Sequence, residues 1–536
     1  MNTPISYGEA LSSYQIIDER PLPKQNIPAE KLLSNFHPDY QIDSRVPLEI
    51  GANRGDPCHP ELARLLQGDA LIDEADLAGA EVVTTDVLVI GGGGAGASAA
   101  LIAAETGAKV ILATKLRLGD SNTVMAEGGI QASIEPEDTP QRHFDDTLKA
   151  GYNSGSPELI EQLALDGPDV IRWLIQKGMH FDYDEFGDLN TRRAGGTTAD
   201  RVVYFRDYTG LEMMRVLREA VHNSSVEVWD YSPAVELLTN DSGGCSGAVI
   251  SYLKSERYIQ VKARSVIIAT GGIGRVHLNG FPTSNHFGAT GDGLSLAYRL
   301  GAKLRDLDSF QYHPTGLAYP KHLSGTLITE GVRSAGTWLL NNRGERFVDE
   351  LGQRDQVAAA ILRECSEGRG IITPSGDPGV WLDTAGLEHR YPGILEKRFP
   401  KLIHLGERSG INPKKQPMLV YPTLHYQNGG VVIDKDGQTT IPGLYCVGES
   451  SGGIHGKNRL MGNALLEIIS FGRRAGAHAA ENRKRSRDHK KVSLEHISRW
   501  RREMTLANLS FEQKSPLLFP DVVPHDDDAR YDGGGS

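Results

Sequence analysis

Five short stretches of this 536-residue chain gather side chains suited to binding a carboxylated substrate. In chain order they are 311–316 (QYHPTG), 327–333 (LITEGVR), 350–357 (ELGQRDQV), 423–430 (TLHYQNGG) and 455–467 (HGKNRLMGNALLE). These glycine- or proline-marked stretches include two histidines and two arginines: His313, His425, Arg354 and Arg459. Arginine can hold a carboxylate through two parallel hydrogen bonds. Together the stretches are suited to clamping a dicarboxylate while a hydride is transferred.

Each of these residues also has a plain structural explanation when it is considered alone. A single histidine is more often a hydrogen-bonded core residue than a ligand. Arg354 followed by Asp355 is typical of a surface ion pair. Function is therefore inferred from the five stretches together and not from any one of them.

Residues 86–115 predict the site of a dinucleotide cofactor. The segment is expected to form a strand (86–90), a glycine turn, a helix (95–106) and a second strand (110–113). Gly91, Gly93 and Gly96 fit the G-x-G-x-x-G pattern, which lets the backbone approach a pyrophosphate. The helix would point its free N–H groups at the phosphates.

The second strand ends in Thr114-Lys115, where an NAD site would carry an acid for the ribose hydroxyls. This favours FAD over NAD, and Glu449 is a candidate for the missing acid. Further contacts are expected from polar and glycine-containing loops and from the start of a helix over 463–482. The predicted cofactor-binding residues are Gly91, Gly93, Gly94, Gly96, Thr114, Lys115, Ser121, Asn122, Thr123, Gly128, Gly129, Thr270, Gly271, Asp292, Glu449, Asn463 and Leu465.

The composition is that of an ordinary globular protein, with 39% apolar and 24% charged residues. A formal net charge of −12 argues against general nucleic-acid binding, because no basic surplus exists to neutralise phosphates. No run approaches 18 apolar residues and the start shows no signal-peptide pattern. We therefore expect no transmembrane segment and a cytoplasmic setting, with any membrane association made through partner subunits. The four cysteines form no C-x-x-C pair, and no metal site is expected.

Alternation of strands and helices predicts an α/β fold. We expect a Rossmann-like FAD-binding domain split by an inserted α+β capping domain, with an N-terminal extension and a short C-terminal tail. The boundaries are 1–82 for the extension, 83–300 and 425–482 for the FAD-binding domain, 301–424 for the cap and 483–536 for the tail. Only 60–66 and 73–78 of the extension have helical patterns. It would either wrap over its own domain or serve as a docking arm for a partner.

The five stretches and GLYCVGE (443–449) follow one another in the order of a known family. From about 84 to 480 the chain closely resembles the flavoprotein subunit of fumarate reductases and succinate dehydrogenases, with L-aspartate oxidase as a near relative. The motifs that carry the resemblance are QYHPTG, LITEG, ELGQRDQV, HY-x-x-GG, GLYCVGE and HG-x-NRL.

The resemblance implies a role for each matching residue. Arg354 matches the arginine taken as the proton donor, Glu330 a member of its proton relay, and His313 the histidine that holds and polarises the substrate. The matches to substrate-carboxylate contacts are Thr329, His425 and Arg459. The resemblance also implies hydride transfer between flavin N5 and an alkene carbon. Because the chain has no cluster-type cysteines, an iron–sulfur subunit is the expected electron partner.

Several positions depart from the family pattern. Ser121-Asn122-Thr123 stands where the membrane-coupled enzymes carry a histidine bonded to the flavin. An amide cannot form that bond, so we expect non-covalent FAD and chemistry in the direction of reduction, or of an oxidase. Asn428 replaces a family Met or Cys, and RSAG (333–336) replaces RGEGG. Only 460–536 follow Arg459, so the long helical C-terminal domain of the membrane enzymes is expected to be absent.

The leading interpretation is FAD-dependent reduction of fumarate to succinate, or the reverse reaction, by the catalytic subunit of an electron-transfer complex. L-aspartate oxidase is an alternative, disfavoured because Gly316 gives HPTG where the oxidases have HPTA. A third interpretation is an ene-reductase or dehydrogenase for a bulkier unsaturated acid, based on Asn428 and RSAG. A non-catalytic flavoprotein scaffold is a fourth, but it would have no use for the intact clamp of histidines and arginines.

Overall fold

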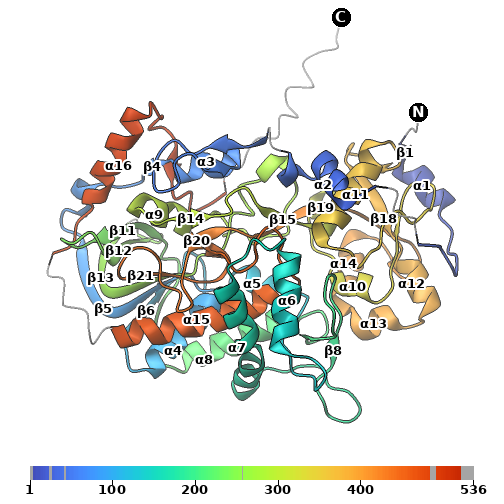
Figure 1. The fold of residues 1–536 in the computed structure, drawn as a ribbon, viewed down its shortest axis with the longest axis horizontal. Helices are drawn as coiled ribbons and strands as arrows, with labels where there is room; N and C mark the ends of the chain where they lie inside the picture. Colours follow the sequence, from blue (N-terminus) through green and yellow to red (C-terminus); the bar gives the residue numbers. More distant parts are fainter. Residues whose placement is uncertain (1–3, 23–26, 42–43, 256, 483–490, 521–536) are drawn as a thin grey trace, which may run out of the picture.

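The computed structural model describes residues 4–22, 27–41, 44–255, 257–482 and 491–520. Two β-sheets organise the fold, and they lie toward opposite ends of the long axis in Figure 1. Of the predicted C-terminal tail, residues 483–490 and 521–536 lie outside the described residues.

The larger sheet has seven strands in the order β10-β6-β5-β13-β12-β11, with β21 paired to β13. The bounds are β5 (Glu81–Ile90), β6 (Val110–Ala113), β10 (Glu227–Trp229), β11 (Ala234–Thr239), β12 (Cys245–Tyr252), β13 (Arg257–Ile268) and β21 (Leu444–Cys446). Residues 87–90 are all buried, as expected of a parallel strand that is covered on both faces. Parallel pairing of Val266 with Leu444 joins a late segment of the chain to the sheet of the glycine turn.

Two helices pack closely beside the glycine turn. α4 (Gly94–Glu105) follows β5, and α15 (Asn463–Asn482) runs along α4. Glycines permit this approach, because a Cβ at Gly472 would lie 2.2 Å from Ser98 Oγ and one at Gly476 2.3 Å from Ala99 O. Other helices on this side in Figure 1 are α6 (Pro140–Ala150), α7 (Pro157–Gln176) and α8 (Thr209–His222). The predicted strand over 110–113 and helix over 463–482 are confirmed.

The second sheet has six strands in the order β1-β17-β18-β19-β15, with β16 paired to β18. The bounds are β1 (Ile5–Ser6), β15 (Phe310–Leu317), β16 (Leu339–Leu340), β17 (Ile371–Ile372), β18 (Pro378–Leu382) and β19 (Met418–Gln427). β15 and β19 run antiparallel with His313 opposite Thr423, which brings the QYHPTG and TLHYQNGG motifs side by side. The helices of this part are α10 (Glu330–Ser334), α11 (Arg354–Ser366), α12 (Thr384–Arg390), α13 (Ile394–Arg398) and α14 (Pro400–Ser409).

The N-terminal residues contact both parts of the molecule. β1 adds to the second sheet through β17, whereas α3 (Pro60–Leu66) packs against α9 (Asp292–Leu300). The helix expected over 60–66 is confirmed, and 73–78 contains the 3-10 helix η3 (Glu74–Leu77). Two helices of about two turns each, α1 (Tyr7–Ser13) and α2 (Ala29–Phe36), lie where the sequence predicts no helix. These contacts favour an extension that wraps over its own chain.

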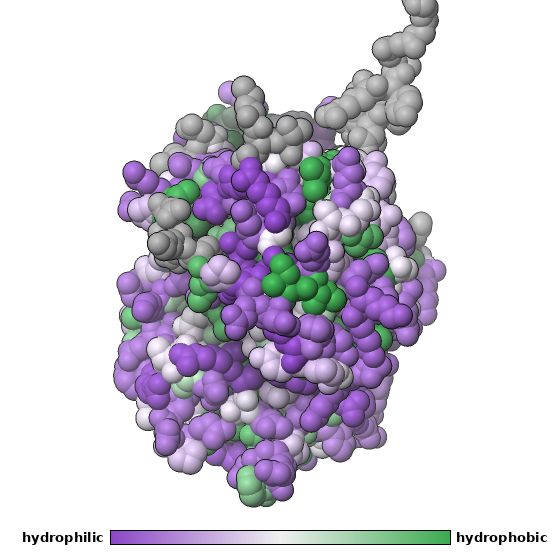
Figure 2. All heavy atoms as spheres, turned by 90° about the vertical axis from the view of Figure 1, so that its right-hand side faces the viewer, coloured by the Kyte–Doolittle hydropathy of each residue, from purple (hydrophilic) through white to green (hydrophobic). Residues whose placement is uncertain are grey.

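Short elements complete the described structure. They are β2 (Val46–Pro47), β3 (Pro57–Cys58), β4 (Asp69–Ala70), β7 (Ile130–Gln131), β8 (Thr191–Arg192), β9 (Val202–Val203), β14 (Leu304–Arg305), β20 (Gly430–Val432), β22 (Ser451–Gly452), β23 (Lys514–Ser515), α5 (Asn122–Met125), α16 (Glu495–Leu506), η1 (Pro38–Tyr40), η4 (Leu278–Gly280), η5 (Lys321–Leu323) and η6 (Gly448–Ser450). Within the described ranges, no helix combines the length and apolar character needed to cross a bilayer. The end of the molecule that carries β18 and α12 is mostly hydrophilic, with a compact hydrophobic group near its centre (Figure 2).

Candidate active site

A cavity of about 800 Å³ connects the glycine turn to the histidines and arginines of the five stretches. Of the predicted cofactor-binding residues, its lining includes Gly91, Gly93, Gly94, Thr114, Lys115, Ser121, Asn122, Thr123, Gly128, Gly129, Thr270, Gly271, Asp292, Glu449 and Leu465. The lining also includes His313, Thr329, Glu330, Arg354, His425 and Arg459. Residues separated by more than 300 positions in the sequence therefore share one cavity.

Close backbone packing shapes the glycine turn. Gly91 has φ +118°, and a Cβ there would lie 2.2 Å from Ala269 O. A Cβ at Gly96 would lie 1.9 Å from Gly91 O. Gly96 does not line the cavity, so its role is the close packing of helix against strand that the pattern predicts. Gly93 is the N-cap residue of α4, and because it has no side chain to accept a hydrogen bond, helix N–H groups are left available to an anion.

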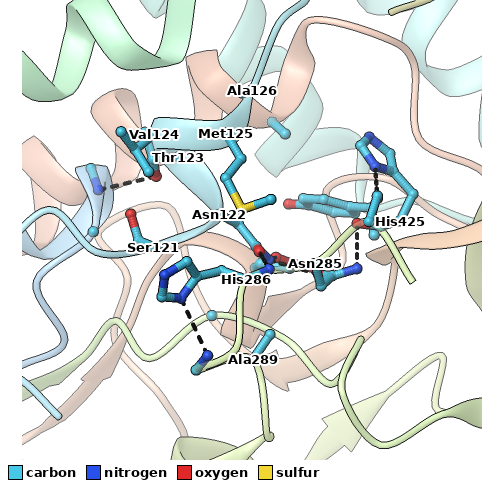
Figure 3. A pocket seen from close by; sticks show the side chains of 18 of the residues that line it. Ser121, Asn122, Thr123, Val124, Met125, Ala126, Asn285, His286, Ala289 and His425 are labelled. Carbon is cyan, nitrogen blue, oxygen red and sulfur yellow. Dashed lines mark hydrogen bonds between the residues drawn. The ribbon is translucent and has the colours of Figure 1, made fainter. Parts of the chain in front are cut away.

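Asn122 connects three walls of the cavity. Figure 3 shows Asn122, the first residue of α5, beside Asn285 and His286. Asn122 Nδ2 donates to Asn285 Oδ1 (2.7 Å) and to Glu449 Oε2 (3.1 Å), and its Oδ1 accepts from His286 N (2.6 Å). The amide is therefore fully engaged as a hydrogen-bonding group.

The acid next to the end of the second strand is Asp292. Lys115 lies just after β6, and its Nζ donates to Asp292 Oδ2 (2.7 Å) and to Thr290 Oγ1 (2.7 Å). Glu449, which the sequence offered for this place, lies elsewhere on the cavity wall, where its Oε1 accepts from Gln427 N (3.0 Å). Burial raises the pKa of Glu449 to about 7.

Two arginines converge on one neutral oxygen. Arg354 Nη1 and Arg459 Nη2 each donate to Gln311 Oε1 at 2.9 Å. Gln311 is held in turn by donation from its Nε2 to Arg459 O (2.7 Å). Burial, and then the charge of Arg354, lower the pKa of Arg459 to about 10. Arg459 Nε has no partner among the described residues. An incoming carboxylate would relieve this concentration of buried positive charge.

Glu330 is the carboxylate that pairs with Arg354 and with a further buried arginine, Arg333. Its Oε2 accepts from Arg354 Nε (2.8 Å) and Arg333 Nη2 (3.2 Å), and its Oε1 accepts from Gly195 N (2.9 Å). Burial raises the pKa of Glu330, but the charges of Arg354 and Arg333 outweigh it and lower the pKa to about 2. Thr329 caps the helix that starts at Glu330, because its Oγ1 accepts from Gly331 N (3.2 Å).

The two histidines lie with ring centroids 5.1 Å apart and line the cavity. His313 Nδ1 accepts from Thr315 N (3.2 Å), so the neutral ring carries its proton on Nε2, which has no partner among the described residues. Ser284 Oγ lies 2.9 Å from His425 Nδ1. Burial, and then the charge of Arg354, lower the pKa of both histidines well below the usual value. Both rings are therefore neutral near pH 7.

Two results differ from the predicted site. Asn463 does not line the cavity, because its Nδ2 donates to Thr147 Oγ1 (2.9 Å) and its Oδ1 lies 2.8 Å from His143 Nε2. Gln311 belongs to the QYHPTG motif, but the sequence assigns it no role, since an uncharged amide has no distinctive chemistry. Only the three-dimensional structure shows that it joins two arginines distant in sequence.

The cavity fits FAD on the evidence of its own residues. A Cβ at Gly91 or Gly96 would fill the turn that brings backbone N–H groups to a phosphate, and Lys115 with Asp292 offers a cation and an acid nearby. From there the cavity reaches His313 and Arg354, so a long cofactor would place its far end beside the cationic site.

Comparisons with known proteins agree with this geometry. Residues 86–465 match the FAD binding domain family. A fumarate reductase (CoM/CoB) subunit of Methanothermobacter marburgensis is 39% identical over 414 residues, which are 75% of this chain and 74% of that protein. The L-aspartate oxidase of Streptomyces coelicolor is 36% identical over 411 residues, 74% and 69% of the two chains. A structure of a quinol fumarate reductase variant from E. coli gives a TM-score of 0.72 at 32% identity, covering 80% of this chain and 74% of the other.

The cavity and the family match define a flavin-dependent oxidoreductase whose cofactor is FAD. Within that class, the chain belongs to the flavoprotein family of fumarate reductases and succinate dehydrogenases, which also has L-aspartate oxidases among its relatives.

Proposed function

We propose that this protein catalyses FAD-dependent reduction of fumarate to succinate. The observation that carries the proposal is the convergence of Arg354 and Arg459, which both line the cavity, on the neutral Gln311 Oε1. Among the described residues, Glu330 is the carboxylate that pairs with Arg354, and none forms an ion pair with Arg459. Such a site leaves net positive charge for a dianionic substrate. Buried guanidinium groups are the preferred partners of carboxylates.

In this proposal, Arg459, His425 and Thr329 bind the substrate carboxylates, and the Nε2–H of His313 polarises one of them. FAD supplies the hydride when it is bound. Arg354 donates the proton that the second alkene carbon requires. Loss of the Arg354 charge removes a main influence that lowers the pKa of Glu330, so Glu330 then takes up a proton more readily and can return it to the arginine.

We further propose that the FAD is held without a covalent bond. Asn122 stands at the position where the resemblance implies a flavin-linked histidine, and its amide is engaged with three neighbouring groups. We also propose that the FAD-binding domain is divided around a cap over 301–424, with the active site between them. Pairing of β13 with β21 on either side of that segment supports the arrangement.

Electrons are proposed to come from an iron–sulfur partner subunit. Cys58, Cys245 and Cys446 are buried and Cys365 is partly buried, all as free thiols. No group of three or more candidate metal ligands occurs in the described parts of the chain. The similar protein from M. marburgensis is named as a subunit, which supports an assembly of this kind.

L-aspartate oxidase is the second candidate, favoured by the relative that carries this name. The sequence difference at Gly316 does not decide against it, because Gly316 is absent from the cavity wall and its Cβ would lie 2.7 Å from Thr423 Cβ. Asn428 also lies off the cavity wall, where its Nδ2 donates to Ser309 Oγ (3.0 Å) and Lys457 O (3.0 Å). Its difference from the family therefore gives little support to a bulkier substrate.

Replacement of Arg354 tests the proposed role. Arg354→Gln should lower fumarate reduction at least a hundredfold while FAD stays bound, because the proton donor is lost. Arg363→Gln on the same helix is the control, since Arg363 pairs with Glu364 away from the cavity. Anaerobic turnover with reduced viologen and flavin absorbance would be measured for both. Undiminished turnover in Arg354→Gln would refute the proton-donor role, and L-aspartate-dependent flavin reduction without fumarate turnover would favour the oxidase.

A further inference from the structure

Part of the N-terminal segment contacts both elements that carry the proposed catalytic residues. Tyr40 OH donates to Asp355 Oδ2 at 2.9 Å, and Asp355 directly follows Arg354 at the start of α11. The preceding residue, Asp39, accepts at Oδ2 from Phe310 N at 2.6 Å, and Phe310 directly precedes Gln311 in β15. Neighbouring residues of η1 thus bond to the residue after Arg354 and to the residue before Gln311.

The anchor on α11 is buried and specific. Asp355 is 4% exposed, and its Oδ2 also accepts from Tyr152 OH at 2.7 Å. Its Oδ1 accepts from Gln356 N (2.9 Å). Because Asp355 and Arg354 are consecutive residues of the first helical turn, a restraint on the carboxylate also restrains the backbone that carries the guanidinium.

The anchor on β15 is similarly supported. Asp39 Oδ1 accepts from Arg45 Nη2 (3.0 Å) and lies 3.3 Å from His59 Nε2. Arg45 Nη2 also donates to Asp308 O (3.1 Å), two residues before Phe310. Asp39 therefore joins the entrance of β15 to a cluster made wholly by the N-terminal segment.

Apolar packing supports both anchors. Leu32 and Leu33 of α2 pack with Ala359 and Ala360 of α11 in one buried cluster. The His37 ring lies edge-on to the ring of Tyr312, with centroids 5.1 Å apart. Tyr312 stands between Gln311 and His313 in the sequence. The family match begins only at residue 86, so the N-terminal residues of this framework lie outside the matched region, whereas α11 and β15 lie inside it.

We propose that Tyr40 and Asp39 are positioning residues, which hold α11 and β15 so that Arg354, bonded to Gln311, meets the substrate in one fixed geometry. The inference rests on the proposed function for its catalytic consequence. It assigns the N-terminal segment a part in the active-site framework besides covering the surface.

A pair of tyrosine variants tests this proposal. Tyr40→Phe removes only the hydroxyl that reaches Asp355. Tyr14→Phe is the matched control, because the Tyr14 hydroxyl also donates from the N-terminal segment to a buried carboxylate, Asp383, which caps a helix without site residues. The full-length holoprotein would be compared by fumarate kinetics and by amide hydrogen exchange of residues 350–358.

Tyr40→Phe should lower kcat by about tenfold to a hundredfold with KM within about twofold, because small misplacements of a reacting group have effects of this size. Exchange at 350–358 should rise in Tyr40→Phe and not in Tyr14→Phe. Unchanged exchange in Tyr40→Phe would overturn the positioning role whatever the substrate is. Raised exchange with unchanged kcat in an active enzyme would also overturn it. A wild-type protein without fumarate turnover would refute the proposed function, while raised exchange in Tyr40→Phe alone would still support the restraint.

Discussion

At the scale of single residues, the site places three cations around few anions. Arg333, Arg354 and Arg459 are buried, while Glu330 is the carboxylate that bonds two of them. Gln311 accepts from two guanidinium groups without neutralising either. A buried like-charge pair is costly unless an anion completes it, so the arrangement favours binding of an anion, which the proposed dicarboxylate would supply.

The charge of Arg459 gives a pH prediction. Its pKa is lowered to about 10, so the cation is present below that value and is lost as pH rises through it. If this cation binds the substrate carboxylate, as proposed, the KM for fumarate should be flat from about pH 7 to 9 and rise about tenfold per unit well above pH 10. Steady-state kinetics would be measured at each pH, together with the unfolding temperature, which shows whether the protein is still folded. A KM that stays constant up to pH 11 in folded protein would contradict the assignment.

At the scale of elements, the strand–turn–helix unit depends on backbone contact. The Gly91 and Gly96 positions leave no room for a Cβ, and the atoms in the way belong to the backbone, which cannot rotate aside. Sequence pattern predicted this unit well, since the glycine spacing, α4 and β6 are local properties. It did not predict α1 and α2, whose buried residues pack on the second sheet and on α11, contacts that join distant parts of the sequence.

A glycine pair tests the unit. Gly96→Ala should abolish FAD retention and lower stability by more than about 2 kcal/mol, because its Cβ would lie 1.9 Å from Gly91 O. Gly8→Ala in α1 is the control, since nothing lies within 4 Å of its Cβ. That control should be neutral or slightly stabilising. Flavin content after gel filtration and denaturant unfolding would be measured, and normal FAD content in Gly96→Ala would refute the predicted turn.

At the scale of the whole molecule, the N-terminal segment ties the two sheets together. It contributes β1 to one sheet and α3 to the side of the other, and between them it contacts β15 and α11. The candidate site likewise contains contacts that could not be predicted from local sequence. Motifs identified His313, Arg354 and Arg459, but the contacts of Gln311, Asp39 and Tyr40 join residues far apart in sequence, and no local pattern reveals such contacts.

Substitution of Asn53 tests whether the contacts of the N-terminal segment stabilise the fold. Its Oδ1 accepts from Leu304 N (2.8 Å) and its Nδ2 donates to Leu304 O (2.7 Å), where both residues are buried. Asn53→Ala removes these partners and should lower the free energy of unfolding by about 2 kcal/mol. Asn412→Ala, in an exposed turn, should change it by less than about 1 kcal/mol. Equal effects of the two substitutions in urea unfolding would contradict a structural tie at Leu304.

The most direct test of the central claim is an anaerobic assay of the purified protein with reduced viologen, with and without fumarate, followed by acid denaturation. The proposed function predicts rapid dye oxidation only with fumarate, formation of succinate, and release of free FAD into the acid supernatant. Flavin-loaded protein that does not respond to fumarate would contradict fumarate reduction. Flavin that stays with the acid-precipitated chain would contradict non-covalent binding.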